Sequence, residues 1–136
     1  MNNKKLRVPV WIYGLVGVLL MVIGYRLMGA SRTGEHPQPR AGVSAAKVMP
    51  ASEWAAQPDV ARIYAMAREI PEVLDGIYCY CNCSKHSHHY SLLTCYESDH
   101  AAMCDICLGE AALAYKLARQ GKTLQEIRLA IDAQYG

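Results

Sequence analysis

Apolar residues follow different patterns along the chain, and the first pattern predicts a membrane-spanning helix. From Val8 to Tyr25 the sequence runs for 18 residues without a charged side chain. As a helix this stretch would span about 27 Å, close to the hydrocarbon thickness of a bilayer. Aromatic residues near both of its ends are typical of such a segment, namely Trp11, Tyr13 and Tyr25. We therefore expect a cytoplasmic tail and a transmembrane anchor within residues 1–30.

Charges beside the apolar run predict its orientation. Lys4, Lys5 and Arg7 precede the run, and the positive-inside rule places them in the cytoplasm, so that the rest of the chain lies outside. The same residues also suit a cleaved signal peptide. Against cleavage, the run is longer than a usual signal-peptide core, and Met28 and Ala30 make a poor cleavage site. We expect the anchor to be retained.

A second pattern covers residues 31–57, which are rich in Gly, Ala, Ser and Pro and show no apolar periodicity. The prolines around His36 favour an extended backbone, because proline fixes its own φ and restricts the residue before it. This composition predicts a flexible linker between the anchor and a domain over residues 58–136. No role is predicted for His36.

Helical periodicity dominates the domain. The first predicted helix follows Asp59, an expected N-cap, and ends before Pro71. Its apolar face consists of Val60, Ile63, Tyr64 and Ala67. Between Ile77 and Cys83, cysteines alternate with other residues, and this period of two favours an extended segment instead of a helix.

Two further helices complete the predicted domain. The longer one begins at Ser98 or Asp99 and is closed by Gly121. Thr123 and Glu126 have the spacing of a capping box, which opens a last helix that ends near residue 135. The expected fold class is therefore mainly α, with an N-terminal transmembrane helix, a flexible linker and a small three-helix domain rich in Cys and His.

Composition and charge narrow the class of protein. Apolar residues make up 52% of the chain, which excludes a disordered protein. Residues 1–50 carry seven basic and one acidic side chain, whereas residues 51–136 carry seven basic and eleven acidic ones. The domain is thus mildly acidic and has no basic patch with interleaved aromatics, so we expect no nucleic-acid partner. A domain of roughly eighty residues has a marginal core, which favours stapling by a metal or by disulfides.

Cysteine and histidine are concentrated between Cys79 and Cys107, and this concentration is the main indication of chemistry. All six cysteines and four of the five histidines lie in this interval. Cys79, Cys81 and Cys83 follow a Cys-x-Cys-x-Cys spacing, and an extended backbone would direct all three thiols to one face. The spacing suits low-coordinate or clustered Cu(I) better than a single tetrahedral ion.

A second motif, Cys-x-x-Cys, consists of Cys104 and Cys107, which share one stripe of the longer predicted helix with His100. Thiolate and imidazole together select soft or borderline ions. We therefore expect a metal site that holds copper, with zinc as the alternative. The expected ligands are Cys79, Cys81, Cys83, His86, His88, His100, Cys104 and Cys107. Among these, the cysteines bind the ion, and His100 and one of His86 or His88 assist.

Two other interpretations of the cysteines stay open. Outside the cytoplasm, six cysteines in a small domain usually form three disulfides, although the two cysteines of a Cys-x-Cys pair rarely bond to each other. For Cys95 alone, a disulfide or a buried thiol is favoured over a metal ligand. A disulfide- or zinc-stapled domain of this kind would serve as an interaction subunit of a membrane complex.

The remaining interpretation is a thiol–disulfide oxidoreductase, because a helix N-terminus activates a Cys-x-x-Cys thiol. We expect a binding protein rather than an enzyme and assign no catalytic residue. A c-type haem is excluded because Leu108, not histidine, follows Cys107. Asp75, Asp99 and Glu110 are interpreted as turn, cap and surface residues rather than as an acid–base pair.

The segments IYCYCNCSKH at residues 77–86, Cys95-Tyr96 and HAAMCDIC at residues 100–107 together resemble a bacterial protein family. It is the CYCXC family of (seleno)proteins, which overlaps with proteins named for a PCYCGC motif, and the resemblance covers about residues 59–135. The chain departs from the second motif name, because Ile77-Tyr78 stands before Cys79 in place of proline and Asn82 stands in place of glycine.

The resemblance implies a membrane-anchored or lipid-anchored protein outside the cytoplasm. Here it implies the bacterial inner or cytoplasmic membrane, with the C-terminal domain facing the periplasm or the outside. Selenoprotein members imply a redox-active or soft-metal position at the motif, carried here by Cys79, Cys81, Cys83, Cys104 and Cys107. We expect a membrane-anchored copper-handling protein that passes its ion to another membrane or extracytoplasmic protein.

Overall fold

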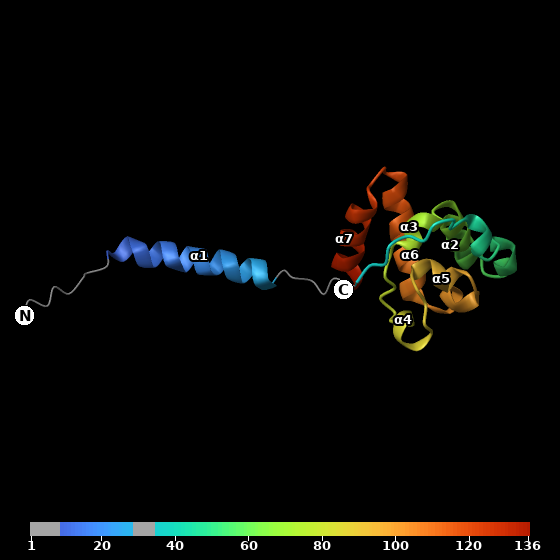
Figure 1. Cartoon of the computed structure of the whole chain (residues 1–136), viewed down its shortest axis with the longest axis horizontal. Helices are drawn as coiled ribbons and strands as arrows, with labels where there is room; N and C mark the ends of the chain where they lie inside the picture. The colour runs from blue at the N-terminus through green and yellow to red at the C-terminus, as the bar shows by residue number, and fades with distance from the viewer. Residues whose placement is uncertain (1–8, 29–34) are drawn as a thin grey trace, which may run out of the picture. The chain divides into compact units, whose positions relative to one another are not determined.

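The computed structural model describes residues 9–28 and 35–136, which belong to two separate units (Figure 1). The first unit contains helix α1, Val10–Met28. Apolar side chains along it, such as those of Trp11, Leu15 and Leu20, are exposed. Within the described residues no helix is found that is both long enough and apolar enough to cross a membrane, so the anchor stays a prediction. Lys4, Lys5 and Arg7 lie outside the described residues, as do residues 29–34.

The second unit is helical, and no strand occurs among the residues described (Figure 1). Its α-helices are α2 Pro58–Glu69, α3 Pro71–Asp75, α4 Cys83–His86, α5 Leu92–Tyr96, α6 Asp105–Arg119 and α7 Leu124–Tyr135. Three 3-10 helices add to these, namely η1 Ala45–Lys47, η2 Ala51–Trp54 and η3 Asp99–Met103. Helix α6 packs against α2, α3, α5 and α7. The mainly α class is confirmed, but the expected three-helix division is too coarse.

Helix α2 buries the predicted apolar face of Val60, Ile63, Tyr64 and Ala67. It begins two residues earlier than expected, because Pro58 occupies its first position and Gln57 is the N-cap. Proline suits this position since its missing N–H has no partner there and its φ is already helical. The prediction that Asp59 caps the helix is wrong: its carboxylate instead pairs with Arg62 on the same exposed face.

The long helix expected from Ser98 onward is divided at Cys104, whose backbone is extended. Ser98 caps η3 by accepting the His100 N–H, and α6 starts only after Cys104. The prediction that Gly121 closes this helix is confirmed. Gly121 has φ +75, and the N–H groups of Gly121 and Lys122 bond back to Ala118 and Leu117, as in a Schellman motif.

Helix α7 begins with the predicted capping box. The Thr123 hydroxyl accepts the N–H of Glu126, and the Glu126 carboxylate accepts the N–H of Thr123 at 2.8 Å. We expect Thr123→Ala to lower the free energy of unfolding by about 1 kcal/mol, because N–H groups at the helix start lose their side-chain acceptor. Urea denaturation measures the change, and Gln125→Ala on the same exposed turn is the control. Equal stability of the two variants would refute the role of the cap.

The segment predicted as a flexible linker packs against the helices from residue 35 onward (Figure 1). The N–H of Tyr78 donates to His36 Nδ1 at 2.9 Å, and His36 Nε2 lies 2.7 Å from Asp132 in α7. Further along, Val48 is buried and the N–H of Met49 donates to a carbonyl of α5 at 3.0 Å. Isolated polar and apolar contacts hold this segment, and they leave no apolar periodicity in the sequence.

Asp75, predicted as a turn residue, is a fully buried carboxylate at the end of α3. Arg40 donates to it from its backbone N–H at 2.7 Å and from its guanidinium at 2.7 to 3.1 Å, and the Ser91 hydroxyl donates at 2.7 Å. Burial raises the pKa of Asp75, but the hydrogen bonds from Arg40 and Ser91 outweigh it and lower the pKa below its ordinary value. The carboxylate is therefore ionised and joins the N-terminal segment to α3 and the start of α5.

Two tyrosines connect the core to the cysteine-rich region. The rings of Tyr64 in α2 and Tyr96 in α5 meet edge to face at 4.9 Å, and both are fully buried. Tyr96 donates its hydroxyl to the Cys107 carbonyl at 2.7 Å, and this bond fixes the first turn of α6 beside α5. The packing therefore holds Cys95 and Cys107 on neighbouring helices.

Candidate metal centre

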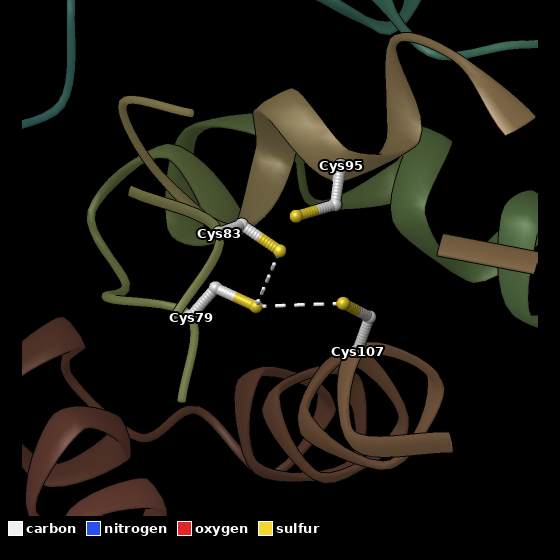
Figure 2. Close-up of side chains that lie close together, drawn as sticks. All are labelled: Cys79, Cys83, Cys95 and Cys107. Carbon is white, nitrogen blue, oxygen red and sulfur yellow. Dashed lines mark hydrogen bonds between the residues drawn. The ribbon is translucent and has the colours of Figure 1, made fainter. Parts of the chain in front are cut away.

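Four buried cysteines converge at one point in the domain (Figure 2). Cys79 lies in the loop after α3, Cys83 opens α4, Cys95 lies in α5 and Cys107 lies in the first turn of α6. Their sulfurs are all within 4.8 Å of one another. Two of the separations are 4.0 Å, from Cys79 to Cys83, and 3.4 Å, from Cys79 to Cys107.

A tight turn brings the Cys-x-Cys-x-Cys residues into this cluster. Asn82 has left-handed backbone angles, φ 61 and ψ 26, which asparagine tolerates better than most residues. The expectation of an extended segment is therefore wrong, because the left-handed residue folds the chain back. Cys81 and Cys83 are bridged by a disulfide with their Cα atoms 5.6 Å apart, contrary to the expectation that such neighbours rarely pair.

Histidine side chains form one side of the cluster. His100 Nε2 lies 3.0 Å from Cys83 Sγ, and His89 Nδ1 lies 3.2 Å from Cys95 Sγ. The two imidazole rings meet edge to face with their centroids 4.6 Å apart. Cys83, His89, Cys95 and His100 make a second set whose donor atoms all lie within 4.8 Å of one another, and a third set consists of Cys81, Cys83, His100 and Cys107.

The structure brings together only part of the predicted ligand set. The members found in these sets are Cys79, Cys81, Cys83, His100 and Cys107. His86, His88 and Cys104 belong to none of the sets found among the described residues. His86 and His88 are exposed, and Cys104 instead acts as the N-cap of α6, its sulfur accepting the N–H of Cys107 at 3.5 Å.

Two members of the sets, Cys95 and His89, lay outside the predicted ligands. Neither belongs to a short cysteine motif, so spacing gives no indication of them. The available signal is burial, because Cys95 stands in the apolar run Leu92-Leu93-Thr94-Cys95-Tyr96, four of whose five residues are buried. A cysteine in such a run is directed into the core, where other thiols can meet it.

Hydrogen bonds between the thiols favour one thiolate in the cluster. Bonds from Cys107 and Cys95 lower the pKa of Cys79 to about 3, against the opposing effect of burial. The pKa of Cys107 is correspondingly raised, chiefly by its hydrogen bond to Cys79. A negatively charged sulfur is thus held by neighbouring thiols, and thiolate is the form that binds metal.

Glu110, predicted to lie on the surface, is fully buried beside this thiolate. One carboxyl oxygen accepts the Tyr80 N–H at 2.9 Å, and the other finds no hydrogen-bond partner among the described residues. Burial and the charge of Cys79 raise the pKa of Glu110 to about 10, so the group is a neutral carboxylic acid near neutral pH. It therefore adds no second negative charge to the cluster.

The four-sulfur set fits the size of a thiolate metal site. Metal–sulfur bonds of about 2.3 Å in a tetrahedron place the sulfurs roughly 3.8 Å apart. The separations of 3.4 and 4.0 Å around Cys79 lie on either side of that value. Each of the four residues comes from a different segment, so one ion would cross-link the domain. In the oxidised state the same sulfurs are close enough for disulfides.

The fold and the site define a small helical, cysteine-rich domain whose buried thiols can bind a metal ion or form disulfides. The chain belongs to the family described as proteins of unknown function with a PCYCGC motif, whose profile matches residues 38–136. The predicted membership is thereby confirmed, and the match begins within the segment that packs through His36 and Arg40. Neither the curated proteins nor the solved structures gave a significant match to the chain.

Proposed function

We propose that the reduced domain binds a soft metal ion, Cu(I), through Cys79, Cys83, Cys95 and Cys107. The observation that carries the proposal is the convergence of four buried sulfurs from four segments within 4.8 Å of one another. Disulfides need only pairwise approach, whereas a mutual approach of four thiols is what coordination requires. The core around them excludes water, which would otherwise compete for the ion.

Copper is proposed ahead of zinc because the cluster holds more sulfur than one zinc ion needs. Cys81 Sγ lies 3.3 Å from Cys79 Sγ and 3.6 Å from Cys107 Sγ, so five sulfurs are contiguous. Cu(I) accepts low coordination numbers and shared thiolates, whereas zinc in structural sites takes four ligands in a closed tetrahedron.

The ion-handling role is proposed for the outer side of a bacterial cytoplasmic membrane, with a membrane or extracytoplasmic protein as recipient. The uncharged run from Val8 to Tyr25, the basic residues before it and the exposed apolar side chains of α1 support a tether. Resistance of the full chain to extraction by alkaline carbonate tests this part. Recovery of the chain in the soluble fraction would refute the tether and leave metal binding untouched.

Native mass spectrometry of the full chain, purified in detergent without air or chelator, tests metal binding. The full chain is needed because residues 35–57 contribute contacts to the fold. We expect bound copper, identified by its isotope pattern, in protein whose cluster thiols are reduced. Reduced protein that takes up no Cu(I) when offered it would refute the proposal, and bound zinc alone would reassign the site to a structural staple.

One observation favours thiol–disulfide exchange as a second candidate function. The Cys79 thiolate lies 3.3 Å from Cys81, one partner of the Cys81–Cys83 disulfide. Attack of the Cys79 sulfur on the Cys81 sulfur forms a Cys79–Cys81 bond and releases Cys83 as thiolate, so electrons are conserved. Turnover of an external dithiol to its disulfide, with oxygen as the final oxidant, is the required readout, and a chain inert in this assay is no oxidoreductase.

A further inference from the structure

We propose that the centre holds two metal ions bridged by the thiolates of Cys83 and Cys95. This inference rests on the proposed soft-metal function and adds a second ion, a second ligand set and a stoichiometry to it. The first ion would be bound by the four cysteines described above. The second would be bound by the same two bridging thiolates together with His89 and His100.

The overlap of two donor sets is the basis of this inference. Cys79, Cys83, Cys95 and Cys107 form one set and Cys83, His89, Cys95 and His100 form the other, each with its donor atoms within 4.8 Å of one another. Both sets contain Cys83 and Cys95, so two four-coordinate sites share one edge. A thiolate sulfur has enough lone pairs to bind two soft ions at once, and Cu(I) thiolate sites often cluster in this way.

The two imidazoles are placed to act as terminal ligands. His100 Nε2 and His89 Nδ1 each lie within 3.2 Å of one bridging sulfur, Cys83 and Cys95 respectively. Both residues are half-buried, so their rings stand between the sulfurs and solvent.

Charge balance also favours two ions over one. Four thiolates around one Cu(I) leave three negative charges in a buried site, and such charge is costly away from water. A second Cu(I) with two neutral imidazoles lowers the excess to two.

Loading requires the Cys81–Cys83 disulfide to be reduced, because a disulfide sulfur is not a thiolate ligand. One external dithiol supplies two electrons and two protons, which yields the Cys81 and Cys83 thiols and the dithiol's own disulfide. The released thiol of Cys83 then loses its proton to solvent when the ion binds. The oxidised protein is therefore expected to hold neither ion as described.

The test is a Cu(I) titration of the full chain in detergent, reduced with a dithiol, desalted without air and titrated against a chromophoric Cu(I) chelator. Native mass spectrometry counts the bound ions. We expect two copper ions per wild-type chain and one in the double variant His89→Ala, His100→Ala. The matched control His86→Ala, His88→Ala removes two exposed imidazoles of the same region and is expected to keep two ions. Circular dichroism verifies that both variants fold.

The outcomes separate this inference from the proposed function. A single ion in the wild-type chain, or two ions in folded His89→Ala, His100→Ala, would overturn the bridged pair while leaving a one-ion site. No ion in the reduced wild-type chain would overturn the proposed function itself. X-ray absorption of the wild-type chain keeps the inference falsifiable if the double variant does not fold, because a bridged pair must show a copper–copper scattering path.

Discussion

Replacing Cys95 by serine is expected to weaken Cu(I) binding about 100-fold, whereas replacing Cys104 by serine is expected to leave the affinity unchanged. Structural metal sites are worth about 10–16 kcal/mol, so one of four thiolates contributes about 3 kcal/mol, or roughly two decades of affinity. Cys95 is buried with its sulfur inside the four-cysteine set. Cys104 lies outside all three sets and caps α6, a role that serine also performs well.

The pair forms a matched experiment because both variants remove one thiol and add one hydroxyl. Competition with a chromophoric Cu(I) chelator measures the affinities of the reduced proteins. Equal losses in the two variants would indicate that Cys104 is a ligand, as its Cys-x-x-Cys spacing predicts. An unchanged affinity in Cys95→Ser would remove α5 from the site.

Arg40→Ala is expected to lower the free energy of unfolding by about 3 kcal/mol at neutral pH. The Asp75 carboxylate is 0% exposed, so loss of the guanidinium leaves a buried charge with only its bonds to the Arg40 N–H and the Ser91 hydroxyl. The estimate lies at the lower end for buried pairs because the Arg40 side chain itself is 39% exposed. Urea denaturation measures the change.

Arg62→Ala is the control for this prediction, because Arg62 forms an exposed pair with Asp59 and its loss should change stability by less than about 1 kcal/mol. A similarly small effect in Arg40→Ala would contradict the assigned role of the buried pair. The comparison also checks that residues before 58 belong to the folded unit, since Arg40 reaches α3 from that segment.

The same pair makes a pH-dependent contribution with a defined sign. The pKa of Asp75 in the folded protein is lowered from its ordinary value of 3.8. Its stabilising contribution is therefore fully present above that ordinary value and is lost as the pH falls through the lower, folded-state pKa. The stability difference between wild type and Arg40→Ala should thus be largest near neutral pH and shrink in acid. A difference that grows in acid would contradict this assignment.

Elements specified by short-range signals could be predicted from the sequence. The buried face of α2, the stop at Gly121 and the capping box at Thr123 each depend on residues within a few positions of one another. The burial of Asp75 and Glu110 could not be predicted, because it depends on partners distant in sequence. The same holds for His36, whose partner Asp132 lies at the other end of the domain.

In the candidate site, too, features that depend on neighbouring residues could be predicted, and features that depend on tertiary packing could not. The cysteine motifs identified the region, but the helical stripe of His100, Cys104 and Cys107 requires a continuous helix. The extended backbone at Cys104 interrupts it and leaves that sulfur beside the helix N-terminus. Cys95 and His89 entered the site through packing alone, so no spacing rule identifies them.

Half of the buried sulfur set comes from α5 and α6 rather than from the Cys-x-Cys-x-Cys segment. A synthetic peptide of residues 77–90 would retain Cys79, Cys81, Cys83 and His89 but would lack Cys95 and Cys107. It would also lack the helices that close the cluster to water. Affinities measured on such a peptide would describe an open, solvated chelate, and motif-grafting experiments with this segment would need to transplant the helical scaffold as well.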